Sequence, residues 1–132
     1  LSSAGVLGVQ GINKSIVKTF AANNDGETFD AGPGLYLSAM AHTGSDGQKV
    51  LTLPASPTIG DEYILMDIGG TLSPGFGGGD NIRLTITRAG SQQIGVSSTA
   101  LATTADLNKK HATVVLIYVA SNTWIGYGDI GS

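Results

Sequence analysis

The sequence contains no cysteine, and only 13% of its 132 residues are charged. Without cysteine, the fold relies on no disulfide and the chain has no thiol nucleophile. Because globular domains usually carry about 25% charged residues, other residue types must cover this surface. Glycine, threonine and serine, with 20, 13 and 12 copies, supply that cover. A hydroxyl-rich surface with little charge protects poorly against association, which indicates a protein that works within an assembly.

A strong charge of one sign and a long apolar run are also missing. Seven Lys and Arg against ten Asp and Glu, with no basic run, argue against a nucleic-acid partner. The longest apolar run, residues 114–120, is far shorter than the ~20 residues of a membrane-spanning helix. The first ten residues lack the cationic start and the length of a signal peptide, so we do not expect them to be one. We therefore expect neither nucleic acid nor a membrane as partner.

Alternation with a period of two dominates the chain from residue 12 onward. Between residues 82 and 87, isoleucine and leucine alternate with arginine and threonine, the pattern of a strand with one buried face. The segment 113–120 is apolar on both faces, so we expect it at the centre of a sheet and covered on both sides. Only residues 103–110 resemble a helix, of two turns at most. Further strands are expected over residues 15–20, 34–41, 49–53, 62–68, 93–97 and 123–127.

Turn residues separate these strands. Asn24-Asp25-Gly26 and Asp46-Gly47 favour hairpins, and Ser121-Asn122 favours a tight turn between the last two strands. Many short strands separated by turns predict an all-β fold, an antiparallel sandwich or barrel that is jelly-roll-like, with at most one short helix.

The length of the chain fits one compact domain. We expect this single β domain over residues 12–132, preceded by an extended N-terminal arm over residues 1–11. The arm has no charge and three glycines, which disfavour a helix. The glycine-rich segment 69–80 is expected as one long loop.

Candidate catalytic residues are few and poorly placed. His42 and His111 lie at strand ends, and neither belongs to a nucleophile motif. Asp61 and Glu62 are adjacent, so on a strand they would point to opposite faces rather than into one cleft. We therefore expect no catalytic site and no enzymatic activity.

Two loops have only a partial likeness to ligand-binding motifs. Residues 23–30 contain fragments of a calcium loop, without the alternating ligands and the final glutamate. Residues 75–80 lack the last glycine of a dinucleotide fingerprint, and a strand rather than a helix follows them. We therefore expect neither a cofactor nor a metal.

Apolar and aromatic residues remain as candidates for contacts with a protein partner. We expect the single tryptophan, Trp124, to pack in the core, with stacking on a sugar ring as the alternative. Five residues are expected to contact a partner, three in the arm, one in the glycine-rich loop and one on the last strand: Val6, Leu7, Val9, Phe76 and Tyr127.

Three segments of the chain, residues 51–70, 81–86 and 116–125, resemble small β modules of tailed-bacteriophage virions. Such modules occur in tail fibres and in capsid decoration (cement) proteins. In them a leucine-proline pair and a glycine-aspartate turn lead into a strand, a glycine-rich loop and an isoleucine-rich strand, and an asparagine-x-tryptophan turn lies near the end. The matching positions are Leu53, Pro54, Gly60, Asp61, Gly69, Gly70, Asn81, Ile82, Asn122 and Trp124. The loop at residues 75–79 is richer in glycine than such loops usually are.

The resemblance implies a structural, non-enzymatic role in a virion. It implies a homotrimer that binds the major capsid protein lattice on the outer surface of a phage head assembled in the host cytoplasm. In that case the arm would reach a neighbouring subunit, and the segment 69–80 would touch the shell or project outward. The alternative is a receptor-binding module of a tail fibre or tail tip, which contacts a glycan or protein of the host surface through Tyr127 and the glycine-rich loop.

Overall fold

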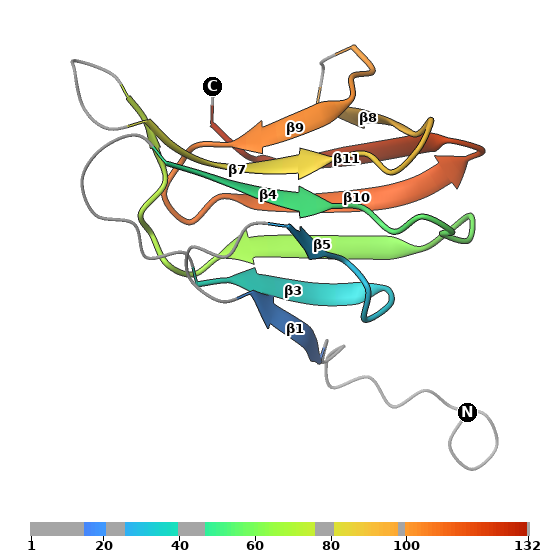
Figure 1. Ribbon diagram of the computed structural model, residues 1–132, viewed down its shortest axis with the longest axis horizontal. Coiled ribbons are helices and arrows are strands. Elements are labelled where there is room, and N and C mark those ends of the chain that lie inside the picture. Colours follow the sequence, from blue (N-terminus) through green and yellow to red (C-terminus); the bar gives the residue numbers. More distant parts are fainter. Residues whose placement is uncertain (1–14, 21–25, 40–46, 76–80, 98–99, 132) are drawn as a thin grey trace, which may run out of the picture.

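The structure is a computed structural model that describes residues 15–20, 26–39, 47–75, 81–97 and 100–131. These residues form eleven β-strands and no helix (Figure 1), which confirms the all-β prediction. The strands in chain order are β1 (Ile16–Phe20), β2 (Glu27–Thr28), β3 (Gly34–Ser38), β4 (Gly47–Thr52), β5 (Glu62–Asp67), β6 (Ser73–Pro74), β7 (Asn81–Thr87), β8 (Gln93–Val96), β9 (Thr104–Leu107), β10 (Thr113–Ala120) and β11 (Thr123–Asp129).

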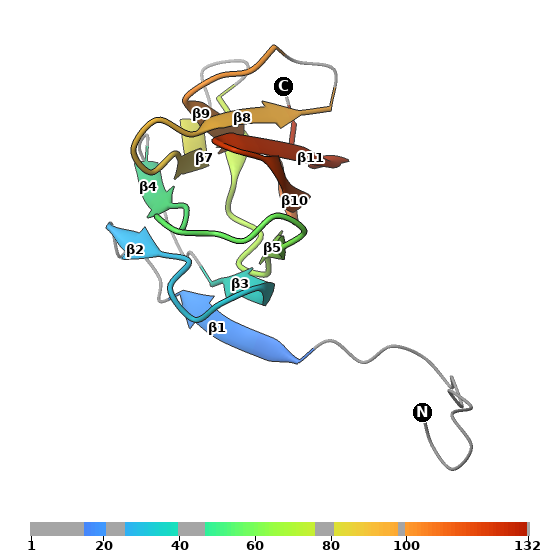
Figure 2. The same ribbon diagram turned by 90° about the vertical axis from the view of Figure 1, so that its right-hand side faces the viewer.

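Two mixed sheets contain all of these strands. The larger sheet has six strands in the order β1-β3-β5-β10-β11-β8. The smaller sheet has the order β2-β4-β7-β6, and β9 pairs with another part of β7. Figure 2 shows the two layers, with β2, β4 and β7 on one side and β3, β5, β10 and β11 on the other. Of the two architectures expected, a sandwich or a barrel, this arrangement is consistent with the sandwich.

The prediction of antiparallel sheets is wrong for five of the strand pairs described. β1, β3 and β5 pair in parallel, as do β2, β4 and β7, and β8 pairs in parallel with β11. From β1 to β5 the chain changes sheet after every strand. The neighbours β1 and β3, β3 and β5, and β2 and β4 are therefore two strands apart in sequence and run the same way. The hairpins predicted at residues 24–26 and 46–47 are therefore wrong, because the strands that they would join, β1 with β2 and β3 with β4, belong to different sheets.

The centre of the larger sheet agrees with the sequence. Residues 113–120 form β10, which pairs with β5 on one side and with β11 on the other. Its three inward side chains are buried. Asn122 makes the tight turn to β11 with φ at 55°, in the left-handed region that asparagine tolerates. Both the central position and the turn are confirmed.

An aromatic row fills the space between the sheets. Phe20, Phe29, Tyr36, Tyr63 and Trp124 are each at most 3% exposed. Successive ring centroids along this row lie 4.8 to 5.8 Å apart. Burial raises the pKa of the Tyr63 hydroxyl to about 12, so this side chain is neutral at physiological pH. The prediction that Trp124 is a core residue is confirmed, and its full burial leaves no ring face for a sugar.

Two segments differ from their predicted structure. Residues 103–110 contain β9 and not a helix, because β7 offers an unpaired backbone edge and Leu107 points into the core. The expected loop 69–80 contains the fully buried Leu72 and the short strand β6, which pairs with β7. Residues 76–80 of that segment lie outside the described residues.

Candidate assembly surface

Apolar side chains follow one another across five strands on the outward side of the larger sheet. Ile16, Leu35, Ile64, Val115 and Tyr127 are direct neighbours in the register of β1, β3, β5, β10 and β11. On β3, β5, β10 and β11, they alternate with inward residues that are buried, so they point away from the core. Together they form the central row of an apolar surface.

Two flanking rows widen this surface. The surface, here called the outer apolar face, consists of Ile16, Leu35, Leu37, Ile64, Met66, Val115, Ile117, Ile125 and Tyr127. Charge occurs only at its borders, where Glu62 lies opposite Ile117 and Asp129 lies opposite Thr113. Five strands about 4.8 Å apart and three rows about 6.8 Å apart give the face, with its polar border positions included, a projected area of about 500 Å², of which the nine apolar side chains take up about 300 Å².

The outer apolar face corrects one prediction about β10. Residues 113–120 were expected to be covered on both sides, but only the inner side packs against the second sheet. Within the described part of the chain nothing covers the outer side, where Val115 and Ile117 are half-buried and Val119 is 43% exposed. A continuous exposed apolar surface of several hundred Å² is typical of an interaction site.

Tyr127 is the one predicted contact residue that the structure describes. It ends the central row and is 61% exposed, and its contact with a partner stays a prediction. Its neighbour Gly126 has no room for a side chain, since a Cβ there would lie 2.5 Å from the carbonyl oxygen of Val115. The absence of a side chain at Gly126 therefore lets β11 lie close to β10 beside Tyr127. The other four predicted contact residues, Val6, Leu7, Val9 and Phe76, lie outside the described residues, as does the predicted arm.

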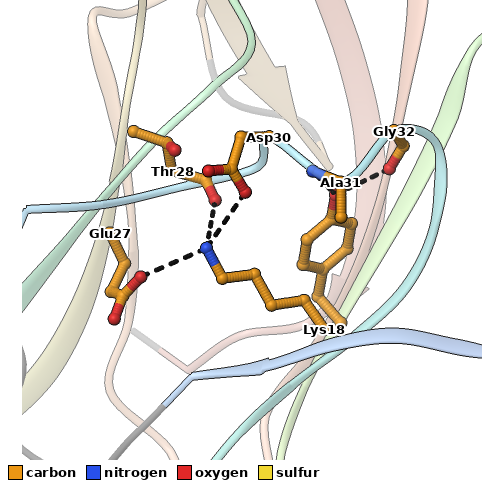
Figure 3. Close-up of polar contacts among 7 residues, drawn as sticks. Lys18, Glu27, Thr28, Asp30, Ala31 and Gly32 are labelled. Atoms are coloured by element: carbon orange, nitrogen blue, oxygen red, sulfur yellow. Dashed lines mark hydrogen bonds and ion pairs between the residues drawn. The ribbon is translucent and has the colours of Figure 1, made fainter.

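A charged cluster ties the edge strand β1 to the smaller sheet (Figure 3). The Lys18 ammonium lies 3.0 Å from a carboxylate oxygen of Asp30 and 3.3 Å from one of Glu27. It also lies 5.3 Å from the ring centroid of Phe20. The hydrogen bond from Lys18 lowers the pKa of Asp30, and the same bond raises the pKa of Lys18. The charges of Lys18, Glu27 and Asp30 are paired with one another at the edge of the sandwich, so the cluster stabilises the fold.

The Lys18 cluster predicts a dependence of stability on acid pH. Because the pKa of Asp30 is lowered in the folded state, its contribution is present above the ordinary value of about 4 and is lost as the pH falls through the folded value. We expect Lys18→Gln to reduce the free energy of unfolding at pH 7 and to reduce it less at pH 3. Urea unfolding at both pH values measures this.

Lys110→Gln is the control for that experiment, because Lys110 is exposed and has no ion pair among the described residues. Its effect should be small at both pH values. A loss for Lys18→Gln that stays the same from pH 7 to pH 3 would contradict the expected linkage.

Two of the residues considered for catalysis, Asp61 and His111, take part in turns, and so does Asp67. Asp67, only 2% exposed, accepts backbone N–H bonds from Gly69 at 3.2 Å, Gly70 at 3.1 Å and His111 at 3.1 Å. In the same way, Asp61 accepts the backbone N–H of Thr58 at 2.9 Å. These bonds fix the loops at the two ends of β5. His42 lies outside the described residues.

Further site types are absent from the part of the chain that the structure describes. No three His, Cys, Asp or Glu side chains in it are grouped so that they could hold a metal ion. Among the same residues there is no helix with the length and apolar character needed to cross a membrane.

No protein-family model matches this sequence, and no curated protein matches it in a sequence comparison.

Proposed function

We propose that this protein is a capsid decoration protein, which binds the assembled head of a tailed phage as a homotrimer and has no enzymatic role. The outer apolar face is the observation that carries this proposal, because it offers a continuous surface for contact with other protein subunits. The low charge of the chain and its resemblance to β modules of phage virions support the same role.

The physical effect of such a protein is linkage between binding and capsid stability. A protein that binds only the closed lattice stabilises that lattice by an amount set by its concentration relative to the dissociation constant. Burial of the nine apolar side chains of the face against other subunits, about 300 Å² in projection, contributes roughly 8 kcal/mol, and the entropic costs of association offset much of this. A modest contact per copy is sufficient, because symmetry repeats it over the whole shell.

The finer parts of this proposal concern position in the virion. The protein would lie on the outer surface of the capsid, bound to the major capsid protein, with its arm on a neighbouring subunit. The segment 69–80 would touch the shell or project outward. A jelly-roll-like strand connection is expected for such a module and stays a prediction.

Binding to purified empty capsids tests the proposal. We expect the protein to bind expanded capsids in hundreds of copies per particle and to raise the temperature at which they break. The reference is the temperature at which capsids without the bound protein break. Failure to bind at saturating concentration would contradict the proposed role.

A receptor-binding module of a tail fibre or tail tip is the second candidate, favoured by the exposed aromatic side chain of Tyr127 on the outer apolar face. The copy number per virion separates the two roles, because a tail component is present in only a handful of copies.

A further inference from the structure

The symmetry of the proposed trimer places a requirement on its interface. A cyclic trimer needs a heterologous contact, in which one surface of each copy binds a different surface of the next copy. The outer apolar face packed on itself would instead give an isologous dimer. The trimer therefore needs a second surface that complements this face. This inference rests on the function proposed above.

The N-terminal segment has the uncharged, partly apolar character that the second surface needs. Residues 1–11 contain no charge and include Val6, Leu7 and Val9, while the outer apolar face has charge only at its borders. A strongly charged segment would lose hydration on such a face, whereas this one loses little.

The position at which the segment joins the fold also fits. Fourteen residues precede Ser15, the first described residue, and β1 begins next to it at Ile16. Ile16 ends the central row and is 55% exposed. Fourteen extended residues span up to about 46 Å. The five strands of the face have a total width of about 24 Å. The segment is therefore long enough to leave its own copy and cross the face of another.

The area of the outer apolar face supports an additional contributor. A stable interface buries about 800 Å² on each partner, and the face offers about 500 Å² of projected area. An uncharged segment that lies along the face, with three large apolar side chains, supplies contact on both of its sides. It therefore brings the interface closer to the size of a stable one.

We propose that residues 4–10 of one copy lie across the outer apolar face of the next copy, with Leu7 and Val9 against its central row and Val6 on the other side of the segment. Each copy then gives one segment and receives one, which closes a ring of three. In the copy that gives its segment, Ile16 lies at the β1 edge of the larger sheet, where the chain passes to the neighbouring copy.

A double-cysteine variant of the full chain tests this placement. The sequence has no cysteine, so Val9→Cys with Tyr127→Cys introduces the only two thiols. Oxidation of the purified protein should give covalent dimers and trimers on a non-reducing gel. Monomers closed by an internal disulfide would show that the segment lies on its own copy and would overturn the proposal.

The matched control combines Val9→Cys with Thr104→Cys. Thr104 is exposed on β9 in the opposite sheet. We expect at least about a tenfold lower yield of covalent oligomers from this pair, whereas equal yields from both pairs would overturn the proposal.

Deletion of residues 1–11 gives a second measurement. The mass in sedimentation should fall from three copies to one, whereas the urea midpoint, measured for both chains below the dissociation constant of the trimer, should not change. A shortened chain that stays trimeric overturns the placement of the segment and leaves the capsid role intact if capsids still bind it. A full chain that is monomeric and does not bind capsids overturns both.

Discussion

Replacement of Val115 by glutamate is expected to dissociate the assembly and leave the fold intact. Val115 lies in the middle of the central row, between Ile64 and Tyr127. In the monomer a glutamate here points into water, whereas in the assembly its carboxylate is buried among apolar side chains without a partner. An unpaired buried charge costs about 3 to 5 kcal/mol. The dissociation constant should therefore rise by at least about 100-fold, which corresponds to about 2.7 kcal/mol.

The matched control is Val50→Glu on the opposite sheet. Val50 lies on β4, is half-buried, and alternates with the inward residues Lys49 and Leu51. The two variants share the change in charge and in strand propensity, so both should lose similar stability, of about 1 kcal/mol. Analytical ultracentrifugation over a concentration series compares their masses. If both variants dissociate to the same extent, the outer apolar face is not the assembly surface.

The sequence predicted elements well where local pattern and packing agree. The strand at residues 113–120 and the turn at Asn122 have their expected structure, because an apolar run and a residue that tolerates positive φ are local properties. Residues 103–110 show the opposite case. Their helical pattern is weak, and they pair with the free edge of β7 instead of forming a helix. In such a short segment, tertiary pairing routinely overrides helix propensity.

The order and direction of the strands could not be predicted in the same way. Alternation shows which residues of a strand point inward, but it does not identify the neighbouring strand. The turn signals marked where strands end, and they are the same whether the chain makes a hairpin or crosses to the second sheet. The parallel pairs of β1 with β3 and of β3 with β5 follow from such crossings.

Most of the outer apolar face was missed for the same reason. Leu35 and Ile64 occupy outward positions on separate strands, and in sequence they are ordinary surface residues of a β protein. They become one surface only when β3 and β5 are placed side by side. One signal was available, namely that residues 113–120 are apolar on both faces. A strand that is apolar on both faces needs a protein layer packed on each side, and the described part of the chain supplies a layer on one side only.

Replacement of Trp124 by alanine is expected to have the largest effect on stability. The side chain is fully buried, and its ring centroid lies 5.5 Å from that of Tyr63 and 5.0 Å from that of Tyr118. Its Nε1 donates a 3.0 Å hydrogen bond to the buried side chain of Gln92. Loss of a buried tryptophan side chain costs about 3 to 5 kcal/mol. The weakened Gln92 network adds to that loss, out of a total stability of about 5 to 15 kcal/mol.

Tyr127→Ala is the control on the same strand, three residues further along on the outward side. Because Tyr127 is 61% exposed, its removal should change the free energy of unfolding of the monomer by less than about 1 kcal/mol. Urea unfolding at a concentration below the dissociation constant measures both variants. Sedimentation at high concentration should then show that Tyr127→Ala weakens assembly although its fold is stable. Equal losses of stability in the two variants would mean that β11 does not separate a core face from an assembly face, and the assignment of the outer apolar face would fail with it.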